Sequence, residues 1–146
     1  MTSPVAPETK PASGLAVGQT FQVVREVDPY RPFYYAAASG DFNPIHIDAA
    51  VGRAAGYGGV ILQGMCTFSW LADACVAYLG APERLTRIKA RFTKPVAAGD
   101  TLTISGRCTA LEAGRVKIEL TVTNQHGDEV LKSGVAEGRV SVGGAG

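Results

Sequence analysis

The chain has 146 residues, of which 46% are hydrophobic and 18% are charged, and its formal net charge is +1. This length suits one domain, and the near-neutral charge argues against a general nucleic-acid-binding protein. No apolar run approaches the roughly 20 residues that a membrane helix requires. We therefore expect one domain over residues 15–142, between a Pro-rich disordered leader (1–14) and a flexible Gly-rich tail (143–146).

The first half of the chain predicts one strand and two short helices. The strand carries aromatic and β-branched residues, and Asp48 suits the N-cap of the second helix. The first helix stops at Ser39-Gly40, where glycine permits a left-handed turn. In chain order these elements cover residues 20–27, 33–38 and 49–54.

A longer helix is predicted over residues 65–79, where apolar side chains recur at intervals of three and four. Asp73 is its only charged residue, so the helix should be buried on all sides. Gly80 and Pro82 end it. The apolar residues that make up this pattern are Met65, Phe68, Leu71, Ala72, Cys75, Val76 and Leu79.

The rest of the chain predicts four strands joined by short turns. They cover residues 85–92, 102–111, 116–122 and 130–142, and the alternation is clearest in the third. Strands that follow one another, segregated from the helices, are typical of an α+β fold. An antiparallel sheet wrapped around the single apolar helix would bury the apolar face of both.

Three cysteines, Cys66, Cys75 and Cys108, form an odd set without CxxC spacing. Cys66 and Cys75 would point to opposite sides of the long helix and could not bridge. We therefore expect buried, reduced thiols in a cytoplasmic protein.

The candidate catalytic side chains, a carboxylate, an amide and an imidazole, lie in one short segment, Ser39-Gly40-Asp41-Phe42-Asn43-Pro44-Ile45-His46-Ile47-Asp48. Pro44 restricts the backbone, so a rigid turn could hold the Asp41 carboxylate and the His46 imidazole toward one point. Such a pair suits a reaction that needs a proton donated and another removed.

The residues alone leave other interpretations of this segment open. Asp41 and Asn43 could cap the turn and the helix that follows it. His46 could be a hydrogen-bonded core histidine. A metal site is the least favoured alternative, because the segment lacks calcium-loop spacing and offers one nitrogen ligand. We expect no metal and no cofactor.

The same segment resembles the SGDxNPxHxD signature of the MaoC-like, (R)-specific enoyl-CoA hydratases, a family that includes bacterial (3R)-hydroxyacyl-thioester dehydratases. The resemblance continues through residues 54–65 and 91–100 and covers about residues 17–142. It implies a hotdog fold, in which the sheet wraps a long central helix. It also implies a hydro-lyase of fatty-acid metabolism that adds water to trans-2-enoyl thioesters or removes it from (3R)-hydroxyacyl thioesters.

Carried over by position, the resemblance implies that Asp41 and His46 are the catalytic pair. The backbone N–H of Gly64, at the start of the central helix, would stabilise the charge on the thioester oxygen. Asn43 and Ser39 become candidates for orienting the pair.

One departure from the family concerns Gln63, where many members have histidine. The glycine after it is retained, so the implied oxyanion role stands, while a side-chain role at position 63 is in doubt. Thr67 or Ser69 could line the pocket, or each hydroxyl could bond back along its own helix.

The substrate would be carried on coenzyme A or on acyl carrier protein (ACP), and both carriers are anionic. Arg91, which shares a strand face with Arg87 and Lys89, could bind them, although an ordinary solvated strand face remains the alternative. Tyr57 and Gly59 could form a pocket edge or a plain loop.

Residues 60–79 are more apolar than one small sheet would hide, and hotdog proteins usually pair. We therefore expect a homodimer, with a heterodimer of related hotdog subunits as the alternative, and no nucleic-acid or membrane partner. Two other functions stay open: a hotdog thioesterase and a non-catalytic acyl-thioester-binding subunit. Both are less favoured, because thioesterases lack the SGDxNPxHxD run and a non-catalytic subunit would be free to lose Asp41 or His46.

Overall fold

The computed structural model describes residues 14–141, so the expected leader, apart from Gly14, and the expected tail lie outside the described residues. The helices and strands, in chain order, are β1 (Thr20–Glu26), α1 (Arg31–Ser39), η1 (Pro44–His46), α2 (Ala49–Ala54), α3 (Gly64–Leu79), η2 (Pro82–Arg84), β2 (Leu85–Phe92), β3 (Thr101–Glu112), β4 (Arg115–Thr123) and β5 (Glu129–Arg139). The two η elements are single turns of 3₁₀-helix.

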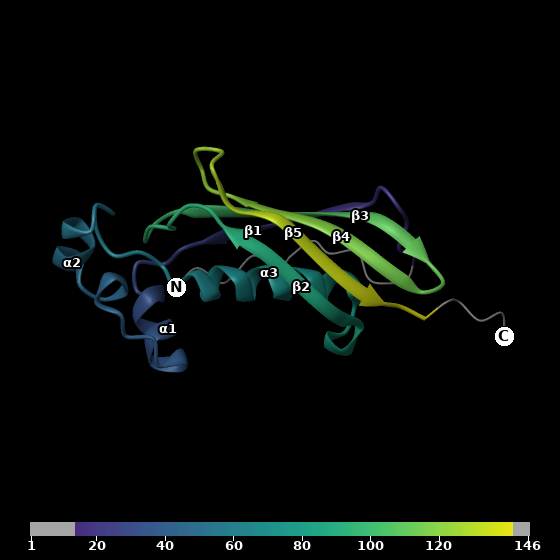
Figure 1. Ribbon diagram of the computed structural model, residues 1–146, viewed down its shortest axis with the longest axis horizontal. Helices are drawn as coiled ribbons and strands as arrows, with labels where there is room; N and C mark the ends of the chain where they lie inside the picture. The colour runs from purple at the N-terminus through teal and green to yellow at the C-terminus, as the bar shows by residue number, and fades with distance from the viewer. Residues whose placement is uncertain (1–13, 142–146) are drawn as a thin grey trace.

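The strands form one antiparallel sheet in the order β1-β3-β4-β5-β2. The sheet curves along α3, and α1 and α2 gather at one end of the molecule (Figure 1). Because β1 and β2 form opposite edges, α3 carries the chain from one edge of the sheet to the other. The predicted α+β arrangement, a sheet wrapped around one long helix, is confirmed.

The core lies between α3 and the inner face of the sheet. Strand β4 alternates as expected, with every second side chain buried, and β3 does so from Leu102 to Cys108. Phe21 of β1 stacks on Tyr78 of α3, with ring centroids 4.6 Å apart. The inward side chains of β3 and β4 include Leu102, Ile104, Cys108, Val116, Ile118, Leu120 and Val122.

The prediction that the long helix is buried on all sides is partly wrong. Met65 is 56% exposed and Phe68, Ala72 and Val76 are half-buried, while Cys66 is buried. A helix that is apolar almost all round gives periodicity little contrast from which to assign a phase. The buried residues of α3 are Cys66, Thr67, Leu71, Ala74, Cys75, Tyr78 and Leu79.

Several element boundaries also differ from the predictions. Helix α1 begins two residues earlier than expected, because proline is well tolerated in a first helical turn and Pro32 lies there. The last strand ends at Arg139 and not at residue 142. Among the described residues, no helix is long and apolar enough to cross a membrane.

Candidate active site

Short-range hydrogen bonds organise the segment that links α1 to α2. The Ser39 hydroxyl donates to the Tyr35 carbonyl at 2.7 Å and accepts from the Asp41 N–H at 3.1 Å. The Asn43 N–H donates to Asp41 Oδ1 at 3.3 Å, and Asn43 Oδ1 accepts from the Ile45 N–H at 3.3 Å. The capping interactions that the sequence left open are therefore present, and they hold the Asp41 carboxylate in place.

His46 ends the 3₁₀ turn and is only 7% exposed. Its Nδ1 lies 2.8 Å from the Ile61 carbonyl oxygen, which can only accept, so Nδ1 carries a proton. In the neutral ring, Nε2 then holds a free lone pair. Nε2 lies 3.6 Å from Asp41 Oδ2, too far for a direct hydrogen bond but close enough for one small molecule to contact both.

A cavity of about 310 Å³ opens beside His46, between the first turn of α3 and the ends of β2 and β5. His46, Gly64 and Tyr57 all line it. Its walls are otherwise mostly apolar, and they include Ile61, Leu62, Phe92, Val96, Val130 and Leu131.

Gly64 is the first residue of α3, and the Gln63 side chain makes no capping hydrogen bond there. The first N–H groups of a helix lack partners within the helix and carry a partial positive charge. A Cβ on Gly64 would lie 3.0 Å from the Phe92 ring, so glycine allows β2 to approach the helix start closely. Together these features leave an electropositive helix end facing the cavity.

Two other residues expected near the substrate, Gly59 and Arg91, are not among the residues that line the cavity. Gly59 instead packs against Gly52. Its carbonyl lies so close to Gly52 that a Cβ on Gly52 would clash with it. Arg91 is exposed on β2, directly opposite Lys132 of β5. Arg91 therefore borders the cavity only through its neighbour Phe92, which does line it.

The structure distinguishes Thr67 and Ser69, the two hydroxyls of α3 that were candidates for lining the pocket. Ser69 donates to the Cys66 carbonyl at 2.7 Å, which is the back-bonding alternative. Thr67 lines the cavity, and its hydroxyl has no hydrogen-bond partner among residues 14–141.

Sequence reasoning missed the contacts of Gln63. Its buried amide nitrogen lies 2.8 Å from the Pro32 carbonyl oxygen and 3.5 Å from the Asp41 carbonyl oxygen. One signal was available: an amide placed between an apolar run and the start of an apolar helix must find partners once it is buried.

The Cys66 thiol and the Tyr35 phenol near the site both stay protonated near pH 7. Burial raises the pKa of the Cys66 thiol to about 11, so this cysteine is a poor nucleophile. Burial also raises the pKa of Tyr35, and the adjacent Cys66 and Asp41 add to that rise. No group of three or more His, Cys, Asp or Glu within the described part of the chain could hold a metal ion.

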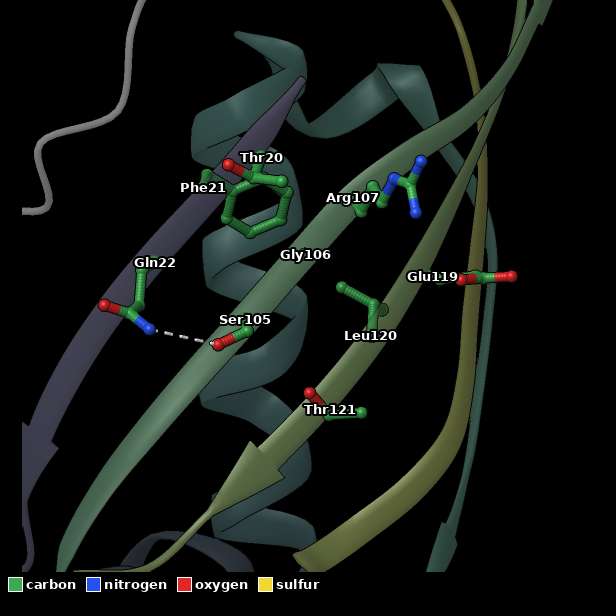
Figure 2. Close-up of a pocket in the computed structure, with 9 residues that line it drawn as sticks. All are labelled: Thr20, Phe21, Gln22, Ser105, Gly106, Arg107, Glu119, Leu120 and Thr121. Atoms are coloured by element: carbon green, nitrogen blue, oxygen red, sulfur yellow. Dashed lines mark hydrogen bonds between the residues drawn. The ribbon is translucent and has the colours of Figure 1, made fainter. Parts of the chain in front are cut away.

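A larger hollow, about 690 Å³, lies over β1, β3 and β4. Figure 2 shows its side chains spread along the strands, with a bond of 3.4 Å from the Gln22 amide to the Ser105 hydroxyl. Arg107 and Glu119 are its ionisable residues, and His46 and Asp41 do not line it. His46 and Gly64 line the smaller cavity instead, and Asp41 lies beside His46.

The family can be assigned directly. A family model described as "MaoC like domain" matches residues 15–130. This chain belongs to the MaoC-like domain family.

Two curated relatives illustrate the similarity. "Probable enoyl-CoA hydratase 2" of Dictyostelium discoideum is 36% identical over 110 residues, which cover 70% of this chain and 34% of that protein. "3-hydroxyacyl-thioester dehydratase Y" of Mycobacterium tuberculosis is 41% identical over 106 residues, which cover 68% of this chain and 36% of that protein. The chain thus spans about a third of the length of these relatives.

Solved structures confirm the hotdog fold. The unliganded R-hydratase PhaJ1 of Pseudomonas aeruginosa superposes with a TM-score of 0.79 at 29% identity, and 93% of each chain is covered. The ChsH1–ChsH2 complex of Mycobacterium tuberculosis gives a TM-score of 0.78 at 24% identity, covering 86% of this chain and 98% of that one.

Proposed function

We propose that this chain is an (R)-specific hydro-lyase that adds water to trans-2-enoyl thioesters and removes it from (3R)-hydroxyacyl thioesters. The observation that carries the proposal is the position of His46. Its Nε2 lies 3.6 Å from Asp41 Oδ2, and His46 lines a cavity that the first residue of α3, Gly64, also lines. The proteins named as hydratases and dehydratases above support the reaction class.

In this proposal, Asp41 and His46 hold the reacting water between them. The bond from His46 Nδ1–H to the Ile61 carbonyl leaves Nε2 free to accept a proton from that water. The water oxygen forms a bond to C3 of the substrate, and the pair returns one proton to C2. The net change is the addition of one water molecule across the double bond, and dehydration is the same path reversed.

Attack at C3 moves negative charge onto the thioester oxygen. The Gly64 N–H, at the positive end of α3, is the proposed donor to that oxygen. Losing one such donor costs about 3 kcal/mol of transition-state stabilisation in other enzymes. Asn43 and Ser39 are the proposed orienting residues, because both hydrogen-bond to Asp41.

The apolar walls of the cavity suit the acyl chain, and the proposed carrier is coenzyme A or ACP. Arg91 and Lys132 are exposed and directly opposite each other on β2 and β5, an arrangement that costs stability unless an anion lies between them. Lys94, the next cation along, is already paired with Asp128 at 2.8 Å. Arg91 and Lys132 are therefore the proposed contacts of the carrier's negative charges, and Tyr57 the proposed pocket edge.

We also propose that the protein is a homodimer located in the cytoplasm. Strand β2 is an edge of the sheet, so its outer backbone groups are open to pairing. Phe92, Met65 and Phe42 are each more than half exposed around the cavity end, which favours a covering partner. A related hotdog subunit remains the alternative partner. All three cysteines are free and buried, which supports the location.

The proposal is tested by mixing purified protein with crotonyl-CoA and following two signals together, the enoyl-thioester absorbance and free thiol. A hydro-lyase removes the absorbance without releasing thiol, and its product is (3R)-hydroxybutyryl-CoA. Thiol release would instead identify a thioesterase. If neither the absorbance nor the free thiol changes, with crotonyl-CoA and with a longer enoyl-CoA, the result would favour a non-catalytic subunit.

A further inference from the structure

Gln63 directly precedes α3, and the hydrogen-bond partners of its side chain fix the orientation of the amide group. It is 1% exposed, and its Nε2 faces two backbone carbonyl oxygens, those of Pro32 and Asp41. Carbonyl oxygens only accept hydrogen bonds, so the amide must present its NH₂ group to them. Its Oε1 consequently points away, and it has no partner among the residues that the structure describes.

These two hydrogen bonds connect parts of the chain that are far apart in sequence. Pro32 lies in the first turn of α1, and Asp41 lies just beyond its last residue, so one amide contacts both ends of that helix. The backbone of Gln63 also leads directly into Gly64. Within residues 14–141, no side chain of α3 itself hydrogen-bonds to residues 31–41, although Arg31 lies 5.8 Å from the Trp70 ring.

We propose that Gln63 is a positioning residue that sets the place of the Asp41 carboxylate relative to the Gly64 N–H. The inference rests on the proposed function, because both groups must reach one substrate at once. Gln63 is buried and its amide donates to the Asp41 backbone carbonyl, so it acts through Asp41 and not by touching the reacting atoms. A displacement of about 1 Å in such a geometry can lower a rate roughly a hundredfold.

The first test variant is Gln63→Met, which keeps the length and volume of the side chain and removes both donors. We expect kcat for crotonyl-CoA hydration to fall by roughly ten- to a hundredfold, with KM within about twofold of wild type. A role in substrate binding would raise KM instead.

The second variant, Gln63→Glu, adds a readout that a merely structural role would not move. A neutral carboxyl group can still donate one hydrogen bond, whereas a carboxylate cannot donate and would face two carbonyl oxygens. The ratio of its kcat to that of wild type should therefore be highest at low pH and decline as the pH rises through the range in which the introduced carboxyl ionises.

Tyr78→Phe is the matched control, because it removes one hydrogen bond of 2.7 Å, to Gln19, from the far end of α3. It should lower thermal stability and leave kcat unchanged. The inference is overturned if both Gln63 variants keep kcat within twofold of wild type, or if the Gln63→Glu ratio is flat with pH. An inactive wild type would overturn the proposed function together with this inference, whereas an active wild type with unaffected Gln63 variants would overturn this inference alone.

Discussion

The two ends of α3 differ in how far their polar groups are hydrogen-bonded. At the C-terminal end, Gly80 adopts a left-handed φ of 92° and donates to the Val76 carbonyl, and Arg84 donates to the Leu79 carbonyl at 2.7 Å. At the N-terminal end, the helix has no side-chain cap, and the buried Gln63 Oε1 and Thr67 hydroxyl have no partners among the described residues.

The C-terminal end of α3 should therefore matter mainly for stability, and the N-terminal end mainly for chemistry. Polar groups that are buried and satisfied stabilise a fold, and groups left without partners are often found at functional sites. The Asp41–His46 pair and the smaller cavity lie at the unsatisfied end. We therefore expect substitutions at the two ends to affect different measurements.

The largest effect is expected from Asp41→Asn and from His46→Ala. Each removes a proton-transfer group, so kcat for crotonyl-CoA hydration should fall by roughly a hundred- to ten-thousandfold. Asp41→Asn should keep the melting temperature near that of wild type, because an amide oxygen can still accept from the Asn43 N–H. Wild-type kcat in either variant would contradict the assignment.

A smaller loss is expected from Gly64→Ala. The new Cβ would lie 3.0 Å from the Phe92 ring, so the helix start and β2 must separate slightly, and kcat/KM should fall by about tenfold. Combining Gly64→Ala with Phe92→Leu gives the added methyl room and should recover part of that loss. If the double variant is no better than the product of the two single effects, this contact is not the cause.

At the other end of α3, Tyr78→Phe should change stability and not rate. Losing the hydrogen bond to Gln19 should lower the free energy of unfolding by about 1 kcal/mol, as measured by urea denaturation. The kcat for hydration should stay within twofold of wild type. A large fall in kcat would show that the two ends are not independent.

The smallest effect concerns alkaline pH. Burial raises the pKa of Cys75 from 9.0 to about 12 in the folded state. The unfolded chain loses this proton at lower pH than the folded chain, so stability should decline as the pH rises from about 9 toward 12. Cys75→Ala should reduce the slope of melting temperature against pH, although Cys66 and Tyr78 add slopes of the same sign. An unchanged slope in Cys75→Ala would show that this thiol does not contribute.

Much of the fold could be predicted from local patterns. The alternation of Val116, Ile118, Leu120 and Val122 indicated a strand with one buried face, and the structure has it. Residues 39–48 marked the candidate site, because proline, glycine and polar residues constrain a short segment locally.

What could not be predicted depends on contacts between distant residues. The Gln63 amide hydrogen-bonds to the carbonyls of Pro32 and Asp41, which lie 31 and 22 residues earlier in the sequence. Hydrophobic periodicity carries no information about such contacts. The pairing of Arg91 with Lys132 follows an irregularity in β5, where Ser133 has a φ of 53°, and strict alternation cannot anticipate a bulge. Which side of α3 is exposed could not be predicted for a related reason, because only the packed sheet selects one side of a helix that is apolar all round.

The most direct test of the central claim is to run the reaction with crotonyl-CoA in water enriched in the heavy isotope of oxygen and to locate the label by mass spectrometry. Water addition by the Asp41–His46 pair predicts the label in the C3 hydroxyl of an intact thioester. Label in a free carboxylate, with unlabelled C3, would mean that water attacks the thioester carbonyl and would contradict the account.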